Sequence, residues 1–163
     1  MIFMLKKMVT TLALVGAMAV ATAAFAAVPS QEYVAAARAE IPAAAVMYGY
    51  KEDVKDGDVE IKFRDNDAFL EYEVKLDLAT KKVLEVEIKG ANSADSTTIV
   101  KTEADIRQIV LDTYPDARDI IVKLDRDGAK AHYDADFTTN KYKVEAKLNP
   151  VTGAFVKREL KYF

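Results

Sequence analysis

The sequence predicts an α+β protein, a tandem repeat of one helix packed on a roughly four-stranded antiparallel sheet. After each of two short helical patterns, the apolar period changes from 3.6 residues to two, which is the spacing of half-buried antiparallel strands. In addition, the stretch YKVEAKLNPVTGAFVKREL at residues 142–160 echoes YEVKLDLATKKVLEVEI at residues 72–88. A hairpin that occurs twice in one short chain indicates two copies of the same unit.

The first 26 residues are expected to be a signal peptide rather than part of the fold. Lys6 and Lys7 precede an apolar run that ends in the small-x-small cleavage site Ala-Phe-Ala at 24–26. An uncleaved membrane anchor is the rival interpretation, because the apolar run could nearly span a bilayer. Its alanine and threonine content and its cleavage site favour removal. The mature chain is therefore expected to begin at Ala27, without a membrane anchor, and to be periplasmic or secreted.

Composition argues against several functions. The chain has no cysteine, so it has no disulfide and no lipidation cysteine after the signal. Removing Lys6 and Lys7 with the signal changes the formal charge from −3 to −5. Acids and bases alternate instead of forming the basic clusters that bind nucleic acid. With one histidine and no cysteine, no set of nucleophile, base and orienting group can be assembled, so we expect no enzyme and no cofactor.

A helix is expected at the start of each unit. In the first unit Ser30 is the expected N-cap, Pro42 ends the helix, and the apolar stripe consists of Val34, Ala37 and Ile41. In the second unit Thr102 is the expected N-cap with Asp105 three residues later, and Pro115 ends the helix. Its apolar stripe consists of Ile106, Ile109, Val110 and Thr113.

Strands with alternating apolar and charged residues are expected after each helix. In the first unit the inward positions are Val59, Ile61, Phe63, Leu70, Tyr72, Val74, Leu76, Leu78, Leu84, Val86 and Ile88, with a weaker strand over 46–50. In the second unit they are Ile120, Val122, Leu124, Ala129, Ala131, Tyr133, Ala135, Phe137, Tyr142, Val144, Ala146, Leu148, Val156, Leu160 and Tyr162. Turns are expected at Asp56-Gly57, Asp127-Gly128, Thr139-Asn140 and 149–153.

The chain is thus expected to divide into a first unit at 27–90, a linker at 91–101 and a second unit at 102–163. The linker is small and polar and has no period. Two separate sheets and one continuous sheet both fit this pattern. In either case one face of each sheet is covered by its helix, and the other face carries charges of both signs.

The second unit resembles the PepSY domain family. The match consists of Tyr142, Val144, Leu148, Thr152-Gly153 and Phe155-Val156. In the first unit Tyr72, Val74 and Leu78 match, but the turn looks shorter and Lys81 or Lys82 stands where glycine is expected. The paired layout also resembles the beta-lactamase inhibitory protein and its relatives. The resemblance implies an exported module that acts by binding, often suggested to be peptidase inhibition, without catalytic residues.

His132 is the principal residue to consider for metal or proton chemistry. It alternates with Asp134 and Asp136 on the polar side of its strand, and these three residues are weak metal candidates. The favoured interpretation is a solvated histidine and no metal site. Asp53, Asp56 and Asp58, and likewise Asp125 and Asp127, flank glycines and are better explained by turns than by calcium.

Five residues are candidates for contact with a partner. Phe69, Ile121, Phe155 and Phe163 lie off the inward register or at strand ends, and each either anchors a partner or packs against the helix edge. Arg158 falls at the inward position of Val86 when the two units are aligned. A bulge after Gly153 could turn it outward, it could lie at a sheet end, or it could form an ion pair between the units.

We therefore expect an exported, non-catalytic PepSY-like module that binds, and through that binding could inhibit, a peptidase or another envelope protein or peptide. The alternative is a periplasmic protein that binds or senses a small ligand or a metal cation. It would use the aspartate-rich turns and the His132 face.

Overall fold

A computed structural model describes residues 29–163, so the expected export signal and its cleavage site lie outside the described residues. The described chain contains helices α1 (Gln31–Arg38) and α2 (Glu103–Thr113). Its strands are β1 (Val46–Asp53), β2 (Asp58–Asp65), β3 (Leu70–Asp77), β4 (Val83–Gly90), β5 (Arg118–Asp127), β6 (Lys130–Thr138), β7 (Tyr142–Leu148) and β8 (Phe155–Tyr162). Neither helix in this part of the chain has the length and apolar character that a membrane crossing requires.

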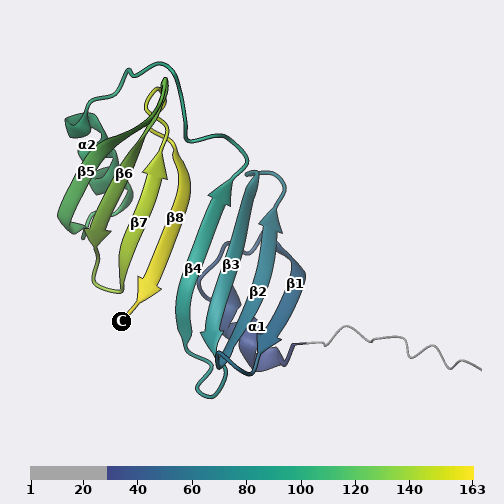
Figure 1. Ribbon diagram of the computed structural model, residues 1–163. Coiled ribbons are helices and arrows are strands. Elements are labelled where there is room, and N and C mark those ends of the chain that lie inside the picture. The colour runs from purple at the N-terminus through teal and green to yellow at the C-terminus, as the bar shows by residue number, and fades with distance from the viewer. Residues whose placement is uncertain (1–28) are drawn as a thin grey trace, which may run out of the picture.

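The strands form one antiparallel sheet in the order β1-β2-β3-β4-β8-β7-β6-β5 (Figure 1). The α+β class is confirmed. The expected tandem repeat of a roughly four-stranded sheet is not found. Of the two arrangements that the sequence left open, the continuous sheet is present, because β4 and β8 pair with each other over Glu85–Lys89 and Lys157–Lys161. The facing side chains Val86 and Leu160 are both buried there, so the junction belongs to the core.

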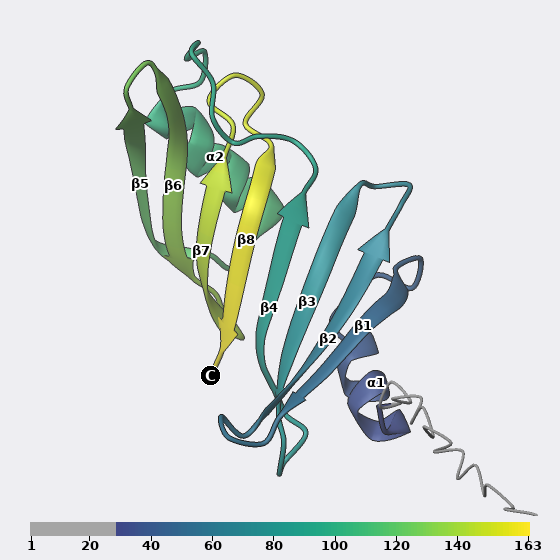
Figure 2. The ribbon, with the colours of Figure 1, turned by 45° about the vertical axis from the view of Figure 1, so that its right-hand side comes forward.

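Both helices lie on the same face of the sheet, α1 behind β2 and β3 and α2 behind β5 and β6 (Figures 1 and 2). One buried apolar cluster runs beneath both of them and includes Ala37 from α1, Ile106 and Val110 from α2, and the sheet residues Phe63 and Phe137. The period-two pattern placed these sheet residues inward correctly. Within residues 29–163 no helix lies over the opposite face of the sheet, which we call the open face.

The two helix starts differ in their capping. Thr102 and Asp105 form the predicted capping box, since Asp105 N–H donates to Thr102 Oγ1 at 3.2 Å and Thr102 N–H donates to Asp105 Oδ2 at 2.7 Å. Ser30 stands at the N-cap of α1, but its side chain makes no capping hydrogen bond. The longer helix therefore also has the better satisfied N-terminus.

Strand pairing in the first half recurs 72 residues later in the second. In the first half, Leu76 lies opposite Val83 and Val74 lies opposite Val86. In the second half, Leu148 lies opposite Phe155 and Ala146 lies opposite Arg158. Each pair of strands has a bulge at the same point. The bulges place Val83 and Phe155 toward the core, where Leu84 and Val156 were expected. The expected alignment of Arg158 with Val86 is confirmed.

The PepSY motif in the first half was placed two residues out of register. By strand pairing, the partners of Tyr142, Val144 and Leu148 are Leu70, Tyr72 and Leu76, not Tyr72, Val74 and Leu78. The turns that follow are equal in length, since Lys81 N–H donates to the Asp77 carbonyl and Gly153 N–H donates to the Asn149 carbonyl, both at 2.8 Å. The motif match misled because apolar residues recur at every second position of a strand.

Lys81 adopts the left-handed conformation of the glycine that it replaces, with φ 62° against 75° at Gly153. At Gly153 a Cβ atom would overlap Cδ1 of Ile109 in α2. The matching helix position in the first half is Ala37, whose small side chain leaves room. A small helix residue in one half and a glycine in the other therefore solve the same packing problem.

Candidate functional site

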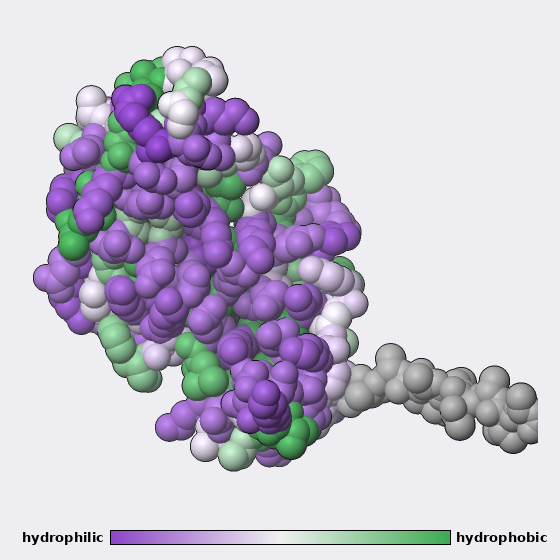
Figure 3. Space-filling model, in the orientation of Figure 1, coloured by the Kyte–Doolittle hydropathy of each residue, from purple (hydrophilic) through white to green (hydrophobic). Residues whose placement is uncertain are grey.

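The open face is covered by charged side chains, as the alternation predicted. Figure 3 shows this face as mostly hydrophilic. Ion pairs link neighbouring strands across it, such as Lys75 with Asp58 at 2.7 Å and Lys62 with Glu73 at 2.8 Å. A solvent-accessible pair such as Lys62 with Glu73 stabilises by at most about 1 kcal/mol, whereas Asp58 in the other pair is buried. Charged residues are depleted in the centres of protein interfaces, so most of this surface lacks the features of a binding site.

Two glutamates face each other at the centre of the open face. Glu87 of β4 lies opposite Glu159 of β8, and Lys157 Nζ lies 2.6 Å from Glu87 Oε1 and 3.9 Å from Glu159 Oε2. Burial opposes the ionisation of Glu87, but the hydrogen bonds from Lys157 and Lys89 hold its pKa below the ordinary value. The lysines therefore neutralise a repulsion that β4·β8 pairing would otherwise create.

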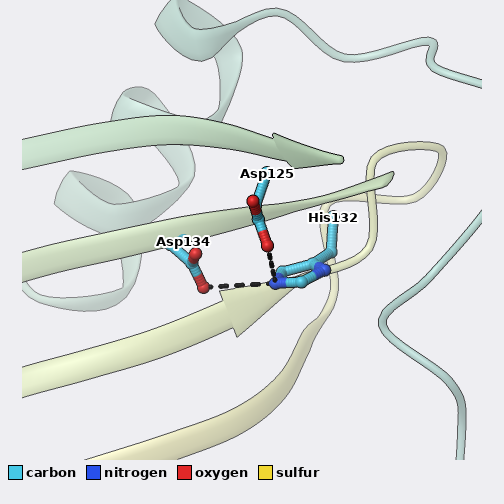
Figure 4. Close-up of side chains that lie close together, drawn as sticks. All are labelled: Asp125, His132 and Asp134. Atoms are coloured by element: carbon cyan, nitrogen blue, oxygen red, sulfur yellow. Dashed lines mark ion pairs between the residues drawn. The ribbon is translucent and has the colours of Figure 1, made fainter. Parts of the chain in front are cut away.

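His132 lies in a cluster of charged residues on the open face, and Figure 4 shows Asp125 and Asp134 beside it. Its exposed fraction is 8%, so the expectation of a solvated histidine is wrong. Nδ1 lies 2.8 Å from Asp95 Oδ1, and Nε2 lies 3.3 Å from Asp134 Oδ1 and 3.7 Å from Asp125 Oδ2. The carboxylates near His132 are thus Asp95, Asp125 and Asp134, and Asp136 is not among them.

The ammonium of Lys147 determines what this cluster can bind. Lys147 Nζ lies 2.8 Å from His132 Nε2 and 3.7 Å from Asp134 Oδ1. It thus occupies the position that a metal ion shared by this nitrogen and this carboxylate would need. The arrangement is a hydrogen-bonded cluster with its own cation, and its geometry does not favour a transition-metal site.

A second feature, a cleft, lies where the turn between β2 and β3 meets the end of β4 and the start of β8. Two adjoining hollows of about 520 and 390 Å³ lie on either side of Phe69. They share Phe69, Leu70, Gly90 and Ala91; the smaller one is also lined by 154–156 of the second half, and the larger one by Arg64, Glu71 and Lys89. We call this the Phe69 cleft. Hollows of this size are typical of ligand and side-chain pockets.

Phe69 itself has an unusual backbone and an exposed ring. Its φ is 55°, in the left-handed region that bulky residues seldom occupy, and 71% of its surface is exposed. Four residues separate the paired Asp65 and Leu70, whereas only two separate Thr139 and Tyr142 at the corresponding turn of the second half. The first half therefore carries a longer turn whose last residue is an exposed aromatic.

The other candidate contact residues are dispersed. Ile121 lies on the open face of β5 and Phe163 ends the described chain, with exposed fractions of 51% and 81%. Phe155 packs edge-on against Tyr114 at 6.0 Å between ring centres. Arg158 faces the helix side and donates from Nη1 to Tyr114 Oη at 3.2 Å, so the preceding bulge does not turn it outward.

Sequence reasoning missed three members of the His132 cluster. A two-residue turn after Asp127 places Asp125 opposite His132. The predicted turn at Asp127-Gly128 was therefore enough to predict this contact. Lys147 follows only from the register of β6 with β7, which pairs it with Asp134. Asp95 lies in the linker, and its neighbour Ser96 forms two backbone hydrogen bonds with Ala131, of 2.8 and 2.9 Å. No local sequence pattern predicts that contact.

Comparison with known proteins bears on the second half of the chain. Residues 100–159 match the family model described as Peptidase propeptide and YPEB domain, or PepSY. No curated protein matches the sequence.

A solved structure of a candidate lipoprotein from Clostridium difficile 630 is 22% identical, over 72% of this chain and 82% of that one, with a TM-score of 0.30. A TM-score this low supports no conclusion about fold or function. The family match confirms the expected resemblance of the second half to the PepSY domain, and it spans α2, β5 to β7 and most of β8.

Proposed function

We propose that the protein is an exported, non-catalytic binding module that engages a protein or peptide partner, such as a peptidase of the cell envelope, through the Phe69 cleft. The observation that carries this proposal is Phe69, an exposed aromatic residue held in a left-handed conformation at the rim of an apolar hollow. Such a conformation costs roughly 1–2 kcal/mol for a residue with a Cβ atom. Backbone strain of this kind is concentrated at functional sites.

The surroundings of Phe69 fit an apolar side chain of a partner. Leu70, Gly90 and Ala91 are among the apolar residues that line the larger hollow, and Arg64 paired with Glu71 belongs to its polar lining. Interface energy is usually concentrated in a few aromatic residues that are surrounded by weaker polar contacts. The cleft also joins both halves, because Ala154, Phe155 and Val156 line its smaller hollow. The expected export signal at 1–26 supports a partner outside the cytoplasm.

The residues around His132 support a non-catalytic role. Within residues 29–163, its ring nitrogens contact only aspartates and a lysine, so no hydroxyl nucleophile is paired with this base. The alternative of a cation sensor is not favoured, because Lys147 occupies the cation position of the cluster. A protein or peptide partner remains the proposal with a specific surface to support it.

Site-specific photo-cross-linking tests this function. A photoreactive phenylalanine analogue is placed at position 69 in one sample and at position 163 in another, in the full-length chain produced in its own host. Phe163 is the matched control, since it is similarly exposed but lies at the chain end away from the cleft (Figure 1). We expect a discrete cross-linked protein or peptide from position 69 and none from position 163.

The partner identified in this way is then measured against Phe69→Asn. Asparagine tolerates the left-handed region, so this variant should fold with unchanged or higher stability. We expect its affinity for the partner to fall at least about tenfold, as for the loss of an aromatic hot spot. Equal affinity of Phe69→Asn and wild type, or equal cross-linking from both positions, would contradict the proposal.

A further inference from the structure

His132 is the only histidine of the chain, and four segments surround it. The linker contributes Asp95, β5 contributes Asp125, β6 contributes Asp134, and β7 contributes Lys147. The imidazole is nearly buried among these groups, whereas each of the four partners is partly exposed. Any change in the charge of His132 must therefore be met by movement of its partners.

The contacts determine which ring nitrogen carries the proton. A carboxylate can only accept a hydrogen bond and an ammonium can only donate one. Nδ1 must therefore donate to Asp95 Oδ1, and Nε2 must accept from Lys147 Nζ, both at 2.8 Å. The contacts of both ring nitrogens therefore fit a neutral imidazole with its proton on Nδ1.

We propose that His132 is a proton-operated switch that exchanges Lys147 for a carboxylate at Nε2. When Nε2 takes up a proton from water, it can no longer accept from Lys147, and two cations cannot stay in contact in this small space. Lys147 moves away with its charge intact. Asp134 and Asp125, already 3.3 and 3.7 Å from Nε2, then accept the new N–H, while Asp95 remains on Nδ1.

The switch changes the open face beside it. Lys147 and Asp134 line a hollow of about 340 Å³ on that face, together with Lys123, Asp136, Glu145 and Lys157 among others. Protonation draws Asp134 toward His132 and frees Lys147 toward the hollow. It also strengthens the contact with Asp95, and so holds the linker more firmly to the sheet.

Nuclear magnetic resonance tests the switch directly, because the single histidine gives one unambiguous set of ring signals. The two ring ¹⁵N signals of the full chain are followed from pH 8.5 to pH 5 in buffer with a chelator. At high pH we expect a protonated Nδ1 and an unprotonated Nε2. We expect the backbone amides of Lys147 and Asp95 to change with the same midpoint as the ring. A protonated Nε2 at high pH, or amides that do not follow the ring, would overturn the proposal.

A variant pair isolates the contribution of Lys147. Lys147→Met removes the cation from Nε2, so the midpoint should move upward by about half a pH unit, a threefold gain in proton affinity. Lys143→Met is the matched control, since Lys143 lies on the same strand and pairs with Glu145 instead. Its midpoint should equal that of wild type. An unchanged midpoint in Lys147→Met would show that Lys147 does not occupy Nε2, and so would a zinc-dependent shift of the ring signals in chelator-free buffer.

Discussion

Three non-glycine residues in the described range 29–163 adopt positive φ, and the reasons for this conformation differ among them. Lys81 has a φ of 62° because its turn has the same hydrogen bonds as the turn that ends at Gly153. Asp119, at 54°, lies at the irregularity where β5 begins to pair with β6. Phe69 is the one of the three whose exposed aromatic side chain borders a cleft. A local backbone requirement therefore accounts for the first two residues, and a binding role is proposed for the third.

Replacing Gly153 with alanine should destabilise the protein more than the same change at Gly57. Both glycines have positive φ, 75° and 74°, so both variants carry the conformational cost of roughly 1–2 kcal/mol. Only at Gly153 does the new Cβ also meet a side chain, Ile109 of α2, whereas nothing lies within 4 Å at Gly57. The extra cost should be about 1 kcal/mol.

Urea unfolding of both variants measures this difference. When Ile109 is already alanine, adding Gly153→Ala should cost only about as much as Gly57→Ala, because the clash with the Ile109 side chain is then absent. Equal destabilisation at the two glycines would show that Ile109 yields freely and that packing does not require glycine at this turn.

At the scale of elements, the two helices show how tertiary packing substitutes for local signals. Helix α2 has a capping box, while α1 is a short helix whose N-cap side chain makes no bond. Isolated helices of this length are not stable in water, so α1 depends on packing against β2 and β3. Its cation–π contact from Arg38 to Phe63, at 4.5 Å, and the burial of Ala37 are such packing contacts.

Removing each N-cap hydroxyl should therefore have unequal effects. Thr102→Ala should cost about 1 kcal/mol, since it leaves the Asp105 N–H without its side-chain acceptor. Ser30→Ala should cost distinctly less, because no side-chain capping bond is lost. Thermal unfolding followed by circular dichroism compares the two variants, and a larger loss in Ser30→Ala would contradict this account.

At the scale of the whole molecule, β4·β8 pairing makes the two halves one body. The junction buries Val86 and Leu160 on the helix side and places the charges of Glu87 and Glu159 on the open side. On the helix side Tyr162 Oη also donates to Glu40 Oε2 at 2.6 Å, so the last strand contacts the loop after α1. Burial and the carboxylate of Glu40 both raise the pKa of Tyr162, consistent with a phenol that stays protonated in this contact.

Truncating Leu160 should destabilise both halves together. Leu160→Ala removes a buried side chain of the junction and should cost about 2–5 kcal/mol. Leu84→Ala is the control, because Leu84 on the neighbouring strand is 41% exposed and its loss should cost about 1 kcal/mol or less. Amide hydrogen exchange should accelerate in β2 and β6 alike, with one unfolding transition. Acceleration confined to one half would show that the halves unfold independently.

The sequence by itself determined the elements and most of their inward positions, because the hydrophobic periods of helix and strand are local, but it did not reveal the bulges that turn Val83 and Phe155 inward. It thus specified the α+β class, the Thr102 capping box, the charged open face and the PepSY resemblance of the second half.

Only the tertiary structure decided the relations between distant segments. Strand β4 is the last strand of the first half and β8 is the last strand of the second, and the two pair in one sheet with apolar residues on the same face. The alternating pattern of a strand does not specify which other strand its backbone pairs with. The sequence also does not specify that Lys147 and Asp95 contact His132. Nor does it specify that residues 154–156 and Phe69 line one hollow. These contacts depend on strand register and loop path, and both are set by packing over the whole molecule.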